Sequence, residues 1–499
     1  MVQDDNDDNE DDHNHHNHHD NNDDNASSPQ SQSQDLPPVL TPPDGDTIRI
    51  LVSTDNHLGY NERDAVRGLD SFAALEEVLY MAKELQADMV LLAGDLFHEN
   101  KPSRRTLHKT MQLFRTYCMG PNPVQIQILN ASHNSQNNNP RTSTSTIPST
   151  TTSTSTSTST PNSSVLFRQG HVNYEDPNYS VDLPIFAIHG NHDDPTREGG
   201  AGNELLAALD LLDAANLVNY IGRQEQVNHI RIDPILIKKG DTHLALYGLG
   251  SMRDERLNRM WQSQKVQFAR PTTTTESSSD NNVQPPTPPS WFNLFALHQN
   301  RDVGRGTKNC VHESMIPEWM DLVVWGHEHE CCIEPQESVV GTFRITQPGS
   351  SVATSLSVGE STMKKIGVLD VRGSHFRMLP IPLTQVRSFV LAQVRLTDQR
   401  SLDPEDPKVD SKVTQLLEDQ VRLLVYQARE KEKEIWQAAM DAGNPVARAE
   451  IMPLANALEK ADDVLVRIKV EHSGFSTLNN QRFGAKFIGQ VANPVRNVT

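Results

Sequence analysis

Five short apolar runs organise this sequence, and each leads into Asp, Asn or His. The runs cover residues 48–53, 89–93, 185–188, 294–297 and 322–325. Continuous apolar runs of this length are typical of strands buried on both faces, as in parallel sheets. We therefore expect the polar residues after each run to lie at the carboxyl ends of strands, where open α/β sheets hold their ligands.

Apolar residues at helical spacing lie between and after these runs. A helix over 72–85 joins the first two strands, which predicts parallel pairing through a right-handed crossover. Further helices are expected over 102–119, where Pro102 suits a first turn, and over 204–215. Their apolar stripes fit packing against the core of this chain, and a partner-binding face is the alternative.

The chain past residue 329 continues with short strands and then changes in composition near residues 380–382. We predict an α/β domain over 47–381 and a smaller α+β domain over 382–499. The elements expected in this part are strands at 343–346, 366–371, 389–396 and 464–470, a Pro/Asp linker at 403–407 and a charged helix at 412–441.

Three segments lack the apolar content that a packed core requires. Residues 1–46 hold thirteen Asp or Glu and no Lys or Arg, so the formal charge of −20 falls to −7 without them. We expect this acidic tail to be disordered, and its His-rich run over 13–19 is a solvated tract or a stray metal binder. The Asn/Ser/Thr-rich segment 130–164 and the segment 271–290 are interpreted as disordered insertions.

The sequence shows no sign of export or membrane insertion. Its start lacks the basic and apolar regions of a signal peptide, and no apolar run approaches the ~20 residues that span a bilayer. The four cysteines, Cys118, Cys310, Cys331 and Cys332, follow neither a zinc-site nor an extracellular disulfide spacing. We expect a reducing, intracellular setting.

The polar ends of the five runs carry metal-compatible side chains. A capped strand with a polar exit turn explains any one of them, but buried imidazoles and carboxylates without partners are costly. Two shared divalent cations would explain all five, and would clamp a phosphoryl group for in-line attack by a hydroxide bridging the metals. A mixed His, Asp and Asn set suits Mn²⁺, Fe²⁺ or Zn²⁺ better than Mg²⁺ or Ca²⁺.

The order of these motifs resembles the calcineurin-like metallophosphoesterase superfamily: Asp-x-His, Gly-Asp, Gly-Asn-His-Asp over 190–193, His, and Gly-His-x-His. Within it, the chain is similar to the eukaryotic double-strand-break repair nucleases of the meiotic recombination eleven family, whose bacterial relative is SbcD. The sequence motifs that match this family are TDNHLGY at 54–60, GDLFHENKPS at 94–103, WGHEHEC at 325–331, QPGSS at 347–351, QRF at 481–483 and VANP at 491–494.

The resemblance implies a two-sheet α/β sandwich with a smaller α+β capping domain over 382–499 that holds DNA. It assigns seven metal ligands, with Asp95 bridging two Mn²⁺ ions. One ion would be held by Asp55, His57 and His329, and the other by Asn191, His298 and His327. Other divalent transition metals remain possible.

The resemblance also implies catalytic roles for two further histidines. His192 would orient the phosphate and protonate the leaving sugar oxygen, and His98 would steady the phosphate. The expected activity is 3′-to-5′ exonuclease and endonuclease cleavage of DNA during double-strand-break repair and meiosis, in the nucleus. Asp193 could orient His192 or cap its loop, and Arg63, Arg67 and Arg301 are candidate DNA contacts, with pairing to a carboxylate as the alternative for each.

The family further implies partners. The helices at 102–119 and 204–215 would form a homodimer, and the region 121–184 would replace the loop that docks a nibrin-type subunit. In the family, the helices that bind the SMC-like ABC ATPase follow the part that corresponds to residue 499. We therefore expect that docking region to be missing here, and a fragment or an alternative gene model is the simpler explanation.

Two other functions share this scaffold. Protein phosphatases and similar phosphomonoesterases carry Gly-Asp-x-x-Asp-Arg-Gly, whose arginine grips a terminal phosphate. Residues 94–100 have no such arginine, which favours a diester substrate. A non-catalytic scaffold should have lost ligands, and none of the seven is missing.

Overall fold

A computed structural model of the chain describes residues 40–130, 167, 170–197, 205–224, 228–271, 289–302, 308–449 and 463–494. Nearly all of the acidic tail and of the two Ser/Thr-rich insertions lies outside these ranges, so the predictions for those segments, the His-rich run included, stay untested. None of the helices in the described ranges combines the length and apolarity that a bilayer crossing requires.

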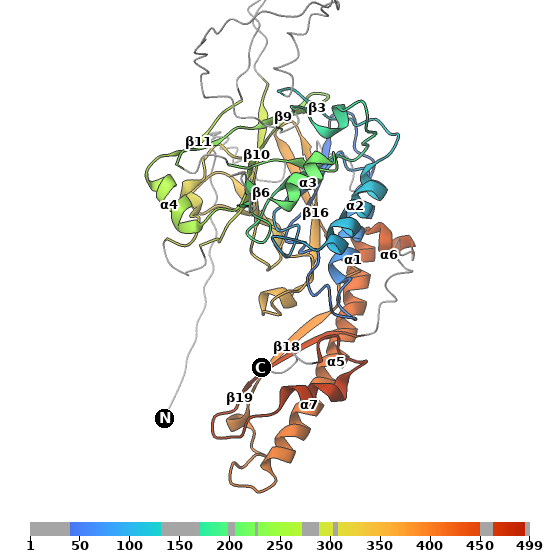
Figure 1. Ribbon diagram of the computed structural model, residues 1–499, viewed down its shortest axis with the longest axis vertical. Coiled ribbons are helices and arrows are strands. Elements are labelled where there is room, and N and C mark those ends of the chain that lie inside the picture. Colours follow the sequence, from blue (N-terminus) through green and yellow to red (C-terminus); the bar gives the residue numbers. More distant parts are fainter. Residues whose placement is uncertain are drawn as a thin grey trace, which may run out of the picture. The chain divides into compact units, whose positions relative to one another are not determined.

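Two mixed sheets form the main part of the described chain (Figure 1). In the first, β1, β2, β4 and β7 are parallel, and β16 adds to β1 in the antiparallel sense. Its strand order is β17 (His375–Pro382), β16 (Lys365–Arg372), β1 (Ile48–Ser53), β2 (Met89–Ala93), β4 (Ile185–Ile188) and β7 (Asn219–Tyr220).

The second sheet has seven strands, with β10, β12, β13 and β15 parallel in its centre. Its strand order is β14 (Cys332–Glu337), β15 (Arg344–Gln347), β13 (Leu322–Gly326), β12 (Trp291–His298), β10 (Thr242–Leu249), β9 (Ile235–Lys239) and β3 (Gln127–Ile128). Two small pairs are β5 (Thr196–Arg197) with β6 (Leu205–Leu206), and β8 (Ile230–Ile232) with β11 (Val266–Phe268).

The alternation of side chains along the strands explains why two sheets stack. Ile48, Ile50 and Val52 of β1 join one core with residues of β10, β12 and β13, so this core lies between the sheets. Leu51 of β1 faces the other way, into a core with α1 (Asp70–Glu84), α2 (Arg104–Cys118) and α3 (Ala208–Ala214). The outer face of the second sheet packs with α4 (Asp254–Gln262). The predicted two-sheet α/β sandwich is confirmed.

The helices predicted from periodicity are mostly present. The helix expected over 204–215 is wrong at its start, because Leu205–Leu206 pair with Thr196–Arg197 as β6 and α3 begins only at Ala208. Along α2, Phe114 and Cys118 are buried in the core of this same chain, and Leu107 and Met111 are partly buried against it.

The C-terminal part pairs two distant strands in parallel, β18 (Phe389–Arg395) and β19 (Leu465–Glu471). The 33-residue helix α5 (Val409–Asp441) packs on this pair, with Val413, Leu417 and Val421 in their common core. Shorter helices are α6 (Pro445–Ala449) and α7 (Asn480–Gly484). Each predicted element here is present, with ends shifted by up to three residues.

Candidate metal centre

Polar side chains meet where β1, β2, β4, β12 and β13 end. The loops there bend sharply: Asp55, His57, Asp95 and His327 have φ values of 52°, 47°, 47° and 86°. A positive φ is costly for residues with a Cβ, and such residues cluster at functional sites. The backbone thus accepts strain in order to aim these side chains.

The first group of side chains is Asp55, His57 and His329, whose ligand atoms lie within 4.8 Å of one another. His57 Nε2 lies 3.1 Å from His329 Nε2 and 3.9 Å from Asp55 Oδ1. His329 Nε2 lies 3.7 Å from the same carboxylate oxygen. These are the three residues that the family resemblance assigned to one ion.

The second group is Asp95, His298 and His327, again within 4.8 Å. His298 Nε2 lies 3.3 Å from Asp95 Oδ2, and His327 Nδ1 lies 2.7 Å from Asn191 Oδ1. Asp95 Oδ2 also lies 3.8 Å from His57 Nε2, so this carboxylate stands between the two groups. The fold therefore brings all seven predicted ligands together at the ends of five separate strands.

Within the described part of the chain, three buried atoms in this cluster make no hydrogen bond of good geometry: Asp55 Oδ1, Asp95 Oδ2 and His298 Nε2, the last two of which lie 3.3 Å apart as an ion pair. Their residues are 0–1% exposed. Burying a carboxylate oxygen or an imidazole nitrogen without a partner costs at least as much free energy as a lost hydrogen bond. All three are metal-ligand atoms facing one another, so the residues present fit a divalent cation centre.

The other polar atom of each of these residues is fixed by the protein. Asp55 Oδ2 accepts hydrogen bonds from Thr54 Oγ1 at 2.7 Å and from the His327 backbone N–H at 3.1 Å. Asp95 Oδ1 accepts from the His192 backbone N–H at 2.8 Å. His298 Nδ1 donates to the Ala93 carbonyl at 2.8 Å, which leaves Nε2 for the centre.

His329 is oriented by a carboxylate that the sequence reasoning missed. Its Nδ1 lies 2.8 Å from Glu360 Oε1, and Glu360 is 1% exposed. The backbone N–H groups of Thr354, Ser355 and Ser357 donate to the same carboxylate. A carboxylate behind a metal-binding histidine fixes its tautomer and ring orientation. No apolar run ends at Glu360, so no sequence signal marked it.

The buried charged groups shift one another's pKa values. Burial by itself lowers the pKa of His298, but Asp95 and Asp55 outweigh it and raise that pKa to about 10. The same contact holds the pKa of Asp95 below its usual range, although burial opposes this. A proton and a divalent cation thus compete for one set of atoms between these two residues.

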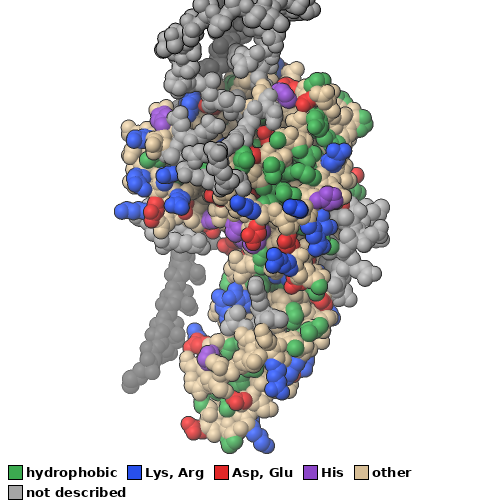
Figure 2. All heavy atoms as spheres, in the orientation of Figure 1, with side chains coloured by type: hydrophobic (Ala, Val, Ile, Leu, Met, Phe, Trp, Pro, Cys, Tyr) green, Lys and Arg blue, Asp and Glu red, His purple; other side chains and the backbone are tan. Residues whose placement is uncertain are grey.

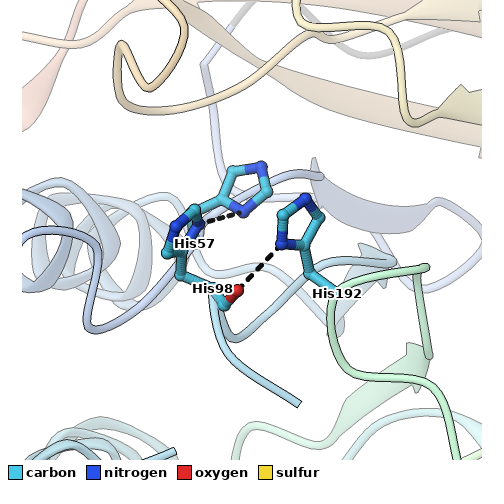
Figure 3. Close-up of side chains that lie close together, drawn as sticks. All are labelled: His57, His98 and His192. Carbon is cyan, nitrogen blue, oxygen red and sulfur yellow. Dashed lines mark hydrogen bonds between the residues drawn. The ribbon is translucent and has the colours of Figure 1, made fainter.

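His192 and His98 stand beside the first group (Figure 3). His192 Nδ1 lies 2.8 Å from the His98 backbone carbonyl, which can only accept, so Nδ1 carries the proton and Nε2 is free. The two rings stack with centroids 5.0 Å apart, and His98 Nδ1 lies 3.4 Å from His57 Nδ1. Burial, followed by the charge of His192, lowers the pKa of His98.

Asp193 caps its own loop. Its carboxylate accepts from the backbone N–H groups of Gly190, at 2.7 Å, and Phe97, at 3.2 Å. The His192 ring is oriented by the His98 carbonyl instead. Gly190 serves close approach, because a Cβ there would meet Asp95 Oδ1 at 2.0 Å.

The three candidate arginines differ. Arg67 is 3% exposed, donates to the Ala353 carbonyl at 2.8 Å and lies 3.6 Å from Asp70, so it shows the carboxylate pairing given as the alternative, and its DNA contact stays a prediction. Arg301 pairs with Glu313 at 3.1 Å and is partly exposed. Arg63 is exposed. Asn300 was missed as a neighbour of the centre: its Oδ1 lies 2.9 Å from His327 Nε2.

Two family models match the chain. The calcineurin-like phosphoesterase family matches residues 48–129, and the family described as the Mre11 DNA-binding presumed domain matches residues 376–498. A crystal structure of TT1561 from Thermus thermophilus matches at 11% identity with a TM-score of 0.26, covering 64% of this chain and 93% of that one.

The chain is also similar to curated proteins named double-strand break repair protein MRE11. Identity is 44% over 456 residues for Arabidopsis thaliana, 43% over 456 for Oryza sativa subsp. indica and 41% over 453 for Rattus norvegicus. Each match covers 90% of this chain and 53%, 55% and 54% of the relative, so the chain spans about half the length of these relatives. The chain thus joins a calcineurin-like phosphoesterase segment to an Mre11-type DNA-binding segment, and its resemblance to the double-strand-break repair nucleases of the MRE11 family is confirmed.

Proposed function

We propose that this chain is a metal-dependent phosphodiesterase that cleaves DNA at double-strand breaks, as a 3′-to-5′ exonuclease and an endonuclease. One observation carries the proposal: seven side chains converge from the ends of five strands, with Asp55 Oδ1, Asp95 Oδ2 and His298 Nε2 buried, facing one another and making no well-formed hydrogen bond to any described residue. The match to a DNA-binding family over 376–498 supports DNA as the substrate.

The proposed ligands follow the two groups. Asp55, His57 and His329 would hold one cation, Asn191, His298 and His327 would hold the other, and Asp95 would serve both. The mixed nitrogen and oxygen donors favour Mn²⁺, with Fe²⁺ or Zn²⁺ as alternatives. When bound, the two cations activate water and offset charge on the phosphoryl oxygens of the substrate.

His192 is proposed to move a proton to the leaving sugar oxygen. Its Nδ1 proton is held by the His98 carbonyl, so Nε2 is the nitrogen available to the substrate. Imidazole titrates in the range that suits such a transfer near neutral pH. The ring of His98, stacked on that of His192, is proposed to steady the phosphate.

A diester substrate is favoured over a monoester. Phosphomonoesterases on this scaffold need a cation for the terminal phosphate dianion, and the corresponding stretch holds His98, Glu99 and Asn100. The side chain of Asn100 instead donates to Asp194, at 2.6 Å, which closes the loop. A non-catalytic scaffold would have no reason to keep positive φ values at Asp55, His57, Asp95 and His327, four of the seven ligands.

We assign DNA binding to the proposed capping domain, residues 382–499, and nuclease chemistry to residues 47–381. Exposed Arg63 and partly exposed Arg301 are the more accessible candidates for phosphate contacts beside the centre. Phosphate contacts of this kind set affinity and its salt dependence. Nuclear localisation follows from the substrate.

Homodimerisation through α2 and α3 is part of the proposal. Figure 2 shows hydrophobic side chains gathered over α3, where Leu211 is 49% exposed, and Leu205 just before it is 40% exposed. An exposed apolar patch of this kind suits a protein interface. Docking of a nibrin-type subunit to the region 121–184 and pairing with an SMC-like ATPase are proposed by family resemblance alone.

The experiment compares three substrates with and without added Mn²⁺: supercoiled plasmid, a duplex with blocked ends, and p-nitrophenyl phosphate. We expect Mn²⁺-dependent nicking and cleavage with little release of p-nitrophenol. Rapid release of p-nitrophenol without nicking would replace the nuclease with a phosphomonoesterase. Binding of DNA without hydrolysis of any substrate in metal-loaded protein would favour the scaffold.

A further inference from the structure

A second cluster of metal-ligand side chains lies outside the centre. Ligand atoms of Asp302, Cys310 and His312 fall within 4.8 Å of one another. Among the described residues it is the one such cluster that shares no residue with the seven ligands or with His98 and His192. Nothing in the proposed nuclease chemistry uses it.

Backbone pairing brings the three residues together. Arg301 and Val311 form a parallel bridge, and the Val311 N–H donates to the Asn300 carbonyl at 2.9 Å. The bridge sets Asp302 beside Cys310 and His312. On the other side, Asn258 of α4 donates to the Cys310 carbonyl at 3.3 Å. The cluster is thus built on fixed backbone.

The ligand atoms follow one another from Asp302 through His312 to Cys310. His312 Nδ1 lies 3.0 Å from Asp302 Oδ2, which fixes the tautomer with the proton on Nδ1. His312 Nε2 lies 4.0 Å from Cys310 Sγ. Around a tetrahedral zinc ion, bonds of about 2.3 Å to sulfur and 2.0–2.1 Å to nitrogen put these atoms about 3.6 Å apart. A shift of a few tenths of an ångström would suffice.

We propose that Asp302, Cys310 and His312 form a separate binding site for a zinc-like divalent cation. Cys310 is 1% exposed and supplies the thiolate, and His312 supplies Nε2. The Asp302 side chain, 47% exposed, supplies carboxylate charge and access from solvent. A thiolate with an imidazole selects Zn²⁺ or Co²⁺ over Mg²⁺ or Ca²⁺.

Binding has a defined proton balance. The S–H bond of Cys310 breaks, its proton passes to solvent, and the sulfur–metal bond forms, while His312 keeps its Nδ1 proton toward Asp302. Burial, with Asp302 and Asp254 nearby, raises the pKa of the Cys310 thiol, so binding strengthens as pH rises. The ion would brace the segment that carries Asn300 toward His327.

The test uses Co²⁺ as a probe on the full chain after metal removal. A cobalt–thiolate bond gives a charge-transfer absorption, and the proposed dinuclear centre contains no cysteine, so that absorption does not come from that centre, and its loss in a cysteine variant identifies which thiol binds. We expect the absorption in the wild type, its loss in Cys310→Ser, and its retention in the matched control Cys332→Ser. Added Zn²⁺ should abolish it by displacing Co²⁺.

His312→Gln serves as a second variant, because His312 is more exposed than Cys310 and its loss leaves no core cavity. We expect Co²⁺ binding at this site to weaken by roughly tenfold or more. The proposal is overturned if cobalt-loaded wild type shows no such absorption, or if it persists in Cys310→Ser. In that case the three residues form only a hydrogen-bonded cluster.

Discussion

Charged groups occur in opposite settings at the metal centre and along helix α5. At the centre, Asp55 and Asp95 are 0% and 1% exposed, and one oxygen of each is fixed by named donors. Along α5, the ion pairs of Arg422 with Asp419 and of Lys433 with Glu430 stand in solvent. The same kinds of side chain are therefore buried in one region and exposed to solvent in the other.

Burial is the reason for the difference. Surface pairs such as Arg422 with Asp419 contribute only about 0.3–0.5 kcal/mol, because water screens them. Buried groups gain more from a partner and lose more without one. Substitutions at the centre and at its buried supports should therefore have large effects, while those on α5 should have small ones. Three predictions examine this contrast in order of expected effect.

The largest effect is expected for His192→Ala. The variant keeps the backbone N–H that donates to Asp95, so metal and DNA binding should persist. Losing the proton donor should reduce cleavage by roughly 10²–10⁴-fold. Single-turnover cleavage with measured bound metal checks this, and His108→Ala, an exposed histidine on α2, is the control. Wild-type cleavage rates in fully metal-loaded His192→Ala would remove the assigned role.

The second effect concerns Arg387, which anchors the chain before β18. Its guanidinium donates to Asp70 at 2.9 Å, to the Val66 carbonyl at 2.8 Å and to the Asp463 carbonyl at 2.9 Å. Arg387→Met would remove the closer of the two guanidiniums beside buried Asp70 and leave only Arg67, at 3.6 Å, which should lower the free energy of unfolding by roughly 3 kcal/mol. Urea unfolding measures this.

The matched control for that measurement is Arg422→Ala on α5, where the side chain is 57% exposed. We expect a change below about 0.5 kcal/mol. If both arginine variants lost equal stability, the contrast between buried and exposed pairs would not hold in this protein.

The smallest of the three effects is expected for Glu360→Gln. The amide would turn a donor toward backbone N–H groups, such as that of Ser355, and would weaken the hold on His329. Metal affinity should fall by roughly 10–100-fold. Glu330→Gln changes the same charge beside His329 on an exposed side chain and is the control. If metal affinity were unchanged in Glu360→Gln, Glu360 would have no role in positioning His329.

The sequence was most informative where a buried strand ends. Each of the five apolar runs is a strand, as expected for short continuous apolar runs that are buried on both faces of a sheet. It was less informative where pairing decides local structure. Leu205 and Leu206 look helical by periodicity, yet they pair with Thr196 and Arg197 as β6. Asp193, next to His192 in sequence, turned out to cap its loop.

By itself, the sequence determined the strands and the order of the motifs, since these follow from local apolar runs and from side-chain chemistry, and its resemblance to a known family supplied the seven candidate ligands. Only the tertiary structure decided which groups meet. The bond from Glu360 to His329, the His98 carbonyl that sets the His192 tautomer, and the burial of Arg67 all join residues through space. Such contacts depend on how two sheets stack and loops bend, which no local pattern encodes.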